Sequence, residues 1–213
     1  MNKLLMFDLD GTLIDSRGGI ACAVNATRKH YGFPPLPLEV IVSYVGNGIK
    51  KLMERSTRDV KLPVPLEEMV KTMHKSYTAD PVAETFLYPG VAETLEELHQ
   101  ANWTMAVISN KPQDISIKIL ESLGIAGYIS DCIGDNGDFP LKPAPDALLH
   151  LMKKYDAAPE NCWFIGDNCT DIQAAANAKI KSIFCTFGFG SKADSVSTAD
   201  ITAFPALVTL LSN

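Results

Sequence analysis

From Tyr88 onward, the sequence alternates between short apolar runs and longer segments whose apolar residues recur at helical spacing. The apolar runs are TMAVIS (104–109), YISDCIG (128–134), NCWFIGD (161–167) and SIFCTFG (182–188). The helical segments around them are residues 91–101, 114–123, 145–155 and 171–178. A further apolar run, LLMF (4–7), opens the chain. Because repeated strand and helix units bury a parallel sheet between two layers of helices, we predict an α/β fold with a doubly wound parallel sheet.

The segment before this alternation has a different pattern. Apolar positions at helical spacing predict a helix over residues 18–30, and residues 38–77 show only helical or irregular patterns. Forty residues without a predicted strand indicate a small helical insert. We therefore expect a core domain made of residues 1–15 and 84–213, and a helical cap domain made of residues 16–83.

Composition excludes several classes of protein. The chain has 213 residues and a formal net charge of −6, so it lacks the basic surface of a nucleic-acid or anionic-membrane binder. It has no apolar run of about 18 residues that could span a bilayer. Its five cysteines are scattered, with no zinc-ligand spacing. We expect a cytoplasmic protein with reduced thiols that binds neither nucleic acid nor membrane.

Polar residues follow the predicted strands at the points where the strands end. They are Asp8 and Asp10 after the first run, Ser109 after the second, Lys142 in the loop FPLKPAPD, and Asp167 with Asp171 after CWFIG. Ligands of an open parallel sheet bind outside the carboxyl ends of its strands. The sequence therefore predicts that these side chains meet in one crevice.

The chemistry that fits this set is phosphoryl transfer to a carboxylate. An aspartate such as Asp8 can act as a nucleophile and form an aspartyl-phosphate. Its charge repels a phosphate dianion, so the site needs a divalent cation and a basic group. Mg²⁺ suits carboxylate, carbonyl and water ligands. Lys142 is the candidate basic group. Ser109 can donate a hydrogen bond to a phosphate oxygen. Asp10, two residues beyond Asp8, can protonate the leaving alkoxide and later take a proton from water.

Each motif taken alone has a simpler interpretation. An Asp-x-Asp after a strand is commonly a turn or a helix cap, and GDNCTD could be a turn followed by an N-cap at Thr170 or Asp171. A single Lys-Pro pair is commonly a surface loop. Their joint placement at strand ends favours the catalytic interpretation.

Four stretches, FDLDGTLIDS, VISNK, LKPAPD and FIGDNCTDI, resemble in sequence and order the motifs of the haloacid dehalogenase superfamily. The resemblance covers almost the whole chain. It implies a Rossmann-like core, a helical cap inserted after the first motif, and a magnesium-dependent phosphatase.

The resemblance also implies roles for individual residues. Asp8 would be the nucleophile, and Asp10 the general acid and base whose backbone carbonyl also ligates Mg²⁺. Asp167 would be the third protein ligand of the metal, and Asp171 would hold metal-bound water or orient Lys142. Three residues would contact the phosphoryl group: Thr12, Ser109 and Asn110.

Within the superfamily, YVGNGIKKLMERS (44–56), TFLYPGVAETLEEL (85–98) and SNKP (109–112) are similar to segments of phosphoglycolate phosphatases. This likeness implies 2-phosphoglycolate as the substrate. A turn at Gly46, Asn47 and Gly48 that opens a helix could receive its carboxylate or phosphate on exposed amides; it could equally be a flexible turn.

Other functions stay open on the sequence alone. The substrate could instead be pyrophosphate, a nucleotide or a sugar phosphate, since caps set substrate choice in this superfamily. A sugar phosphomutase would have to exclude water from the aspartyl-phosphate. A signalling receiver domain also accepts phosphate on a strand-end aspartate, but has no cap and no second acid. The non-enzyme alternative is a non-catalytic magnesium-binding protein.

Overall fold

The computed structural model describes residues 2–212, and its main element is a six-stranded sheet in which every neighbouring pair of strands is parallel. The spatial order is β5-β4-β1-β6-β7-β8. The strands are β1 (Leu4–Phe7), β4 (Thr104–Pro112), β5 (Asp131–Asp135), β6 (Cys162–Gly166), β7 (Lys181–Cys185) and β8 (Ala199–Ile201). The predicted α/β class with a parallel sheet is confirmed.

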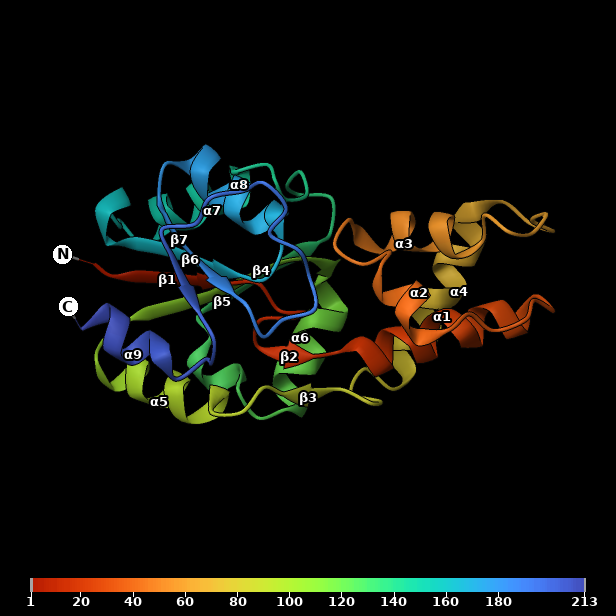
Figure 1. The fold of residues 1–213 in the computed structure, drawn as a ribbon, viewed down its shortest axis with the longest axis horizontal. Helices are drawn as coiled ribbons and strands as arrows, with labels where there is room; N and C mark the ends of the chain where they lie inside the picture. Colours follow the sequence, from red (N-terminus) through yellow and green to blue (C-terminus); the bar gives the residue numbers. More distant parts are fainter. Residues whose placement is uncertain (1, 213) are drawn as a thin grey trace.

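Strand β1 lies in the middle of the sheet, and its side chains pack into two separate cores. Leu4 and Met6 belong to a cluster with helices α7 and α8, whereas Leu5 and Phe7 belong to a cluster with α5, α6 and α9. Figure 1 shows the two layers of helices on opposite faces of the sheet. These helices are α5 (Val91–Gln100), α6 (Gln113–Ser122), α7 (Asp146–Lys154), α8 (Cys169–Ala178) and α9 (Ala206–Leu211). Burial on both faces explains why β1 is apolar throughout.

Four helices form the insertion that Figure 1 shows at one end of the molecule. They are α1 (Arg17–His30), α2 (Leu38–Val42), α3 (Gly48–Ser56) and α4 (Leu66–Ala79). Helix α1 packs against α2 and α4, and α3 packs against α4. The predicted helical insertion is confirmed, while its limits at residues 16 and 83 stay a prediction. We refer to residues 16–83 as the cap.

The chain leaves and re-enters the core through two short antiparallel strands, β2 (Ile14–Asp15) and β3 (Phe86–Leu87). Ile14 pairs with Leu87 and Asp15 with Phe86. The two connections to the cap therefore lie side by side.

A buried arginine joins the segments of the cap. Arg28 of α1 is fully buried and donates hydrogen bonds to the carbonyls of Pro34 and Ser56. It also forms a bidentate pair with Asp59, with N···O distances of 2.9 and 2.8 Å. One guanidinium thus fixes the loop after α1 and the segment after α3 against the same helix.

The sequence predicted the α-helices of the core up to residue 178 to within two residues at each end, but it missed three strands, one α-helix and two short 3₁₀ helices, Ala126–Tyr128 and Pro159–Asn161. Strands β2, β3 and β8 contain only two or three residues each, too few for a periodic pattern. Helix α9 is also short and was not predicted. Over residues 2–212, no helix combines the length and hydropathy needed to cross a membrane.

Candidate active site

Three adjacent strands bring the predicted site residues to one edge of the sheet. Asp8 directly follows β1, Ser109 lies in the last part of β4, and Asp167 directly follows β6. Strand β1 pairs with β4 on one side and with β6 on the other, so these residues lie at or near the carboxyl ends of neighbouring strands. The order of strands along the chain reverses at β1, which is where open α/β sheets bind ligands.

Lys142 connects two of the carboxylates. Its ammonium lies 2.7 Å from Asp8 and 2.8 Å from Asp171, and donates a further hydrogen bond of 3.0 Å to the carbonyl of Ile108. All three charged side chains are buried. The loop that carries Lys142 is fixed by Asn110, whose side-chain oxygen accepts from the Lys142 amide at 2.9 Å. The structure thus confirms that strand ends and the loop converge.

A group of three acidic side chains could hold a metal ion. One carboxylate oxygen each from Asp8, Asp167 and Asp171 lies within 4.8 Å of the others. Asp167 is held by the backbone amides of Phe189 and Gly190, at 2.9 and 2.7 Å. Oxygen ligands of this kind suit a hard divalent cation. The buried acidic donor set therefore fits Mg²⁺.

Close packing around Asp167 explains the glycine in DLDGT. Gly11 has a φ of +84°, and a Cβ added there would lie 1.9 Å from Asp167 Oδ2. Any side chain at position 11 would be strained and would push the carboxylate away. The glycine is needed for the turn after Asp10 and the carboxylate of Asp167 to approach each other.

Burial shifts the ionisation of these groups. It raises the pKa of Asp8 to about 7, opposed by Lys142 and supported by Asp171. Burial, and then the charges of Asp8 and Asp171, raise the pKa of Asp167 well above its usual range. Burial opposes the charge on Lys142, but Asp171 and Asp8 outweigh it and raise the pKa of the ammonium. The excess of negative charge is what a divalent cation would offset.

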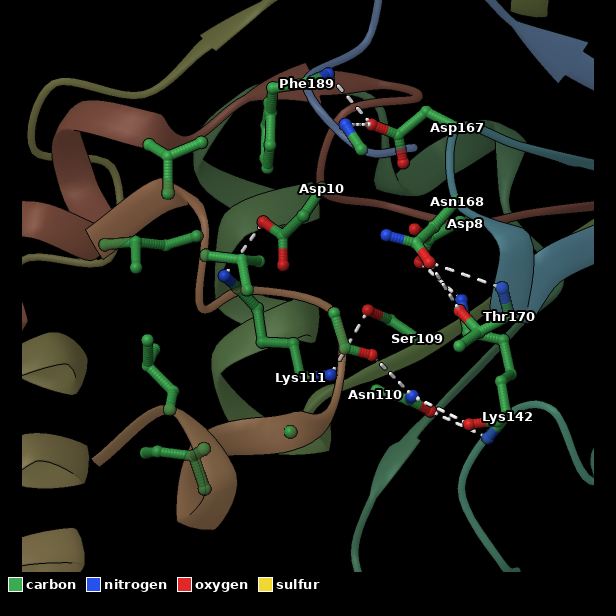
Figure 2. Close-up of a pocket in the computed structure, with 18 of the residues that line it drawn as sticks. Asp8, Asp10, Ser109, Asn110, Lys111, Lys142, Asp167, Asn168, Thr170 and Phe189 are labelled. Carbon is green, nitrogen blue, oxygen red and sulfur yellow. Dashed lines mark hydrogen bonds and ion pairs between the residues drawn. The ribbon is translucent and has the colours of Figure 1, made fainter. Parts of the chain in front are cut away.

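Asp10 faces a second lysine that we did not predict as a site residue. Asp10 Oδ1 accepts hydrogen bonds from Ser16 and from Lys111 Nζ, the latter at 2.9 Å. Figure 2 shows the side chains of Asp10 and Lys111 joined in this way. Lys111 Nζ also donates to the hydroxyl of Tyr77, in cap helix α4, at 2.8 Å. Burial opposes the charge on Lys111, but Asp10 and Tyr77 raise its pKa, so it stays protonated.

The sequence contained a signal for Lys111 and none for Tyr77. Lys111 lies two residues beyond Ser109 in the extended end of β4, the same spacing that linked Asp8 and Asp10. Tyr77 is 34 residues away from Lys111 and only the packing of α4 brings it there.

Ser109 and Asn110 of β4, which are predicted to contact the phosphoryl group, both line the cavity, but their side chains already have protein partners. Ser109 Oγ accepts from the Lys111 amide at 3.2 Å. The amide group of Asn110 donates to the carbonyls of Gly46 and Lys142 at 2.9 and 3.1 Å. Asn110 thus connects the cap to the core. Direct contact of Ser109 and Asn110 with a phosphoryl group stays a prediction.

Of three other predicted site residues, one lines the cavity and two do not. Gly48 lines the cavity, whereas Asn47 is exposed and does not line it. Thr12 is fully buried outside the cavity lining, and within residues 2–212 its hydroxyl has no hydrogen-bond partner. The roles of Thr12 and Asn47 in substrate binding stay predictions without a contact that supports them.

The acidic loop GDNCTD also caps a helix. Asn168, not Thr170 or Asp171, is the N-cap of α8, so our alternative interpretation placed the cap wrongly. Asp171 Oδ2 accepts from the Asn168 amide at 2.9 Å in a capping box, while Oδ1 faces Lys142. One side chain therefore stabilises the helix start and holds the lysine.

The carboxylates and lysines line a cavity of about 360 Å³ between core and cap. Its cap side is mostly apolar and includes Val42, Val45, Ile49, Leu52 and Met73. This volume suits a small ligand. The cavity therefore has charged side chains on its core side and mostly apolar side chains on its cap side.

A family model described as haloacid dehalogenase-like hydrolase matches residues 5–185 of this chain. The chain belongs to this family. Among its relatives is a phosphoglycolate phosphatase of Vibrio parahaemolyticus, 38% identical over an alignment of 193 residues that covers 88% of this chain and 85% of the relative. Another is a phosphoglycolate phosphatase of Aquifex aeolicus, 32% identical over 211 residues, 99% of this chain and 97% of the relative.

Solved structures agree with the family. The crystal structure of a predicted phosphoglycolate phosphatase from Haemophilus somnus matches with a TM-score of 0.92 and 27% identity, covering 99% of this chain and 98% of the other. This haloacid dehalogenase-like hydrolase is therefore an enzyme similar to phosphoglycolate phosphatases. The predicted superfamily, and the likeness within it, are confirmed.

Proposed function

We propose that this hydrolase is a magnesium-dependent phosphatase that hydrolyses 2-phosphoglycolate through an aspartyl-phosphate on Asp8. The observation that carries the proposal is the position of Asp8, a buried carboxylate that lines the cavity, 2.7 Å from the ammonium of Lys142 and beside two further carboxylates. Such an arrangement gives a nucleophile and the positive charge needed for an anionic substrate to approach it.

The metal would be held by the carboxylates of Asp8 and Asp167 and the backbone carbonyl of Asp10. Bound there, Mg²⁺ would offset the charge of the nucleophile and of the phosphoryl oxygens. Asp171, with one oxygen on Lys142, would orient that lysine. The residues present fit these roles, because their carboxylates are buried, close together and only partly neutralised by Lys142.

The chain's own residues would carry out two displacements. In the first, an oxygen of Asp8 attacks phosphorus, the P–O bond to the alcohol breaks, and Asp10 gives a proton to the leaving alkoxide. In the second, Asp10 takes a proton from water, the water oxygen attacks phosphorus, and the bond between phosphorus and Asp8 breaks. Lys142 offsets negative charge in both steps, and Ser109 and Asn110 would position the phosphoryl group.

The substrate assignment rests on the relatives and on the cavity. Relatives that share 32–38% identity with this chain are phosphoglycolate phosphatases. A cavity of about 360 Å³, closed on one side by the cap, suits a small anionic metabolite. Gly46 and Gly48 line its cap side, as expected if the turn at residues 46–48 faces the substrate.

The test is phosphate release from a panel with and without Mg²⁺. The panel contains 2-phosphoglycolate, pyrophosphate, nucleoside monophosphates and sugar phosphates, and the proteins are the parent, Asp8→Asn and Asp156→Asn. Asp156 is exposed and has a φ of 49°, which asparagine tolerates, so Asp156→Asn is a matched control.

We expect the parent and Asp156→Asn to prefer 2-phosphoglycolate, and the activity to vanish with a chelator and in Asp8→Asn. Preference for another phosphate monoester or for pyrophosphate would refute the substrate and retain the mechanism. Interconversion of sugar phosphates without phosphate release would indicate a mutase. No release from any substrate by a folded parent protein would refute the proposal.

A further inference from the structure

Within residues 2–212 two lysines line the cavity, and Lys142 is the one whose charge is balanced by the proposed nucleophile, Asp8. Lys142 donates hydrogen bonds to Asp8 and to the carbonyl of Ile108, and forms an ion pair with Asp171 at 2.8 Å. Its charge is therefore directed to the proposed nucleophile and to Asp171, not to the part of a substrate remote from phosphorus.

Lys111 differs from Lys142 in this respect. An ammonium has three N–H donors, and within residues 2–212 Lys111 uses two, one on Asp10 at 2.9 Å and one on Tyr77 at 2.8 Å. Its ammonium also lies 4.5 Å from the centre of the Tyr77 ring. Lys111 lines the cavity while its side chain is only 4% exposed. It is a fixed cation with one donor available to a ligand.

The surroundings of Lys111 strengthen an interaction with an anion. The cap contributes Val45, Ile49, Leu52 and Met73 to the same cavity, and these apolar side chains keep the local dielectric low. Tyr77 belongs to the cap and Asp10 to the core, so Lys111 lies where the two meet. An anionic group bound here would lie between the reacting centre and the cap.

We propose that Lys111, held by Asp10 and Tyr77, is the residue that selects substrates with a carboxylate beside the phosphate ester. This inference rests on the proposed function, because it assigns the group that recognises the non-reacting end of the substrate. The third N–H of Lys111 donates to a carboxylate oxygen, while Asp8 and Lys142 face the phosphoryl group. Phosphate esters with an uncharged tail lack this contact and bind more weakly.

The test uses two non-hydrolysable ligands that differ only in the tail. These are 3-phosphonopropionate, in which a methylene replaces the ester oxygen, and its uncharged amide, 3-phosphonopropionamide. Their dissociation constants are measured by titration calorimetry at fixed Mg²⁺ on the parent, Lys111→Met, Lys111→Gln and Lys111→Arg. Lys50→Met is the matched control, because Lys50 is exposed and pairs with Glu67 outside the cavity.

We expect the parent and Lys50→Met to bind the carboxylate about 10- to 100-fold more tightly than the amide, the range for a charge-assisted hydrogen bond. This ratio should fall to about 1 in Lys111→Met and in Lys111→Gln, which can still hydrogen-bond Asp10 and Tyr77. Lys111→Arg should restore part of it. The ratio of kcat/KM for 2-phosphoglycolate to kcat/KM for ethyl phosphate should change in the same way as the ratio of affinities.

Two results would overturn the inference. One is equal binding of the two ligands by the parent. The other is an unchanged ratio in Lys111→Met and Lys111→Gln; if both ligands also bind more weakly by the same factor, Lys111 acts only by positioning Asp10. A parent that discriminates in binding but releases no phosphate from 2-phosphoglycolate would refute the proposed substrate and leave the role of Lys111 supported.

Discussion

The ionisation of Asp8 should make the metal-free protein less stable as the pH rises. The pKa of Asp8 is raised from about 3.8 to about 7 in the folded state, chiefly by burial. Between these values the folded protein keeps a proton that the unfolded chain has lost. The contribution of Asp8 to the free energy of unfolding therefore falls as the pH rises from about 4 to about 7, the sign expected for a raised folded-state pKa.

The size of the effect follows from that shift. Between pH 5 and pH 7 Asp8 is ionised in the unfolded chain but protonated in the folded protein. Over these about two pH units, each unit lowers the free energy of unfolding by about 1.4 kcal/mol, so ionisation of Asp8 lowers stability by about 3 kcal/mol. For a domain of this size this equals a change in Tm of about 6–12 °C. Asp8→Asn removes the titrating group and keeps the shape, so the comparison with the parent isolates the contribution of Asp8 together with the part of the rise in the pKa of Asp167 that the charge of Asp8 causes.

The assay is thermal unfolding of the parent and of Asp8→Asn at pH 5, 6, 7 and 8, in a chelator and in Mg²⁺. In the chelator, the parent should lose Tm relative to Asp8→Asn as the pH rises, and Asp8→Asn should be the more stable protein at pH 8. Mg²⁺ should raise the Tm of the parent more than that of Asp8→Asn, since it binds the ionised carboxylate. A difference between the proteins that is independent of pH, or a less stable Asp8→Asn at pH 8, would refute the reasoning.

Three further variants test separate parts of the structure. Asp10→Asn should slow the release of the alcohol from 2-phosphoglycolate about 10²- to 10⁴-fold in a single turnover, but slow the release of p-nitrophenol from p-nitrophenyl phosphate far less, because that leaving group needs no proton; equal losses in this first step would contradict a role as general acid. Lys142→Met should lower kcat/KM about 10²- to 10³-fold at saturating Mg²⁺, because it removes the cation 2.7 Å from Asp8; near-parent activity would exclude that role. Arg28→Met should lower the free energy of unfolding in urea by about 2–4 kcal/mol, because the carbonyls of Pro34 and Ser56 lose their buried donor; a loss under 1 kcal/mol would show that the cap does not depend on Arg28.

The sheet and most of the candidate site residues at the ends of its strands could be predicted from the sequence, because the patterns that indicate them are local. The run from Leu4 to Phe7 is buried on both faces and is therefore apolar throughout. The rule that ligands lie at the carboxyl ends of parallel strands then places Asp8 near Asp167 without any further knowledge of the fold. The structure bears this out, with both residues in the same acidic cluster.

What the sequence did not predict depends on contacts between distant segments. Tyr77 reaches Lys111 because the fold of the cap brings the last part of α4 to the end of β4, and no local sequence pattern indicates this contact. The amides of Phe189 and Gly190 reach Asp167 from a loop after β7 that has no periodicity of its own. Lys111 is the exception, because its spacing from Ser109 is the same as that between Asp8 and Asp10 and can be recognised in the sequence.

The central claim is that Asp8 receives the phosphoryl group, and the most direct test is to look for that bond. Protein mixed with Mg²⁺ and 2-phosphoglycolate is quenched in acid within the first turnover, and the intact protein and its peptides are measured by mass spectrometry. The account predicts one added phosphoryl group on the peptide that contains Asp8, absent in Asp8→Asn and without substrate. A parent protein that releases phosphate yet shows no adduct at any quench time, or carries the adduct on another residue, would contradict it.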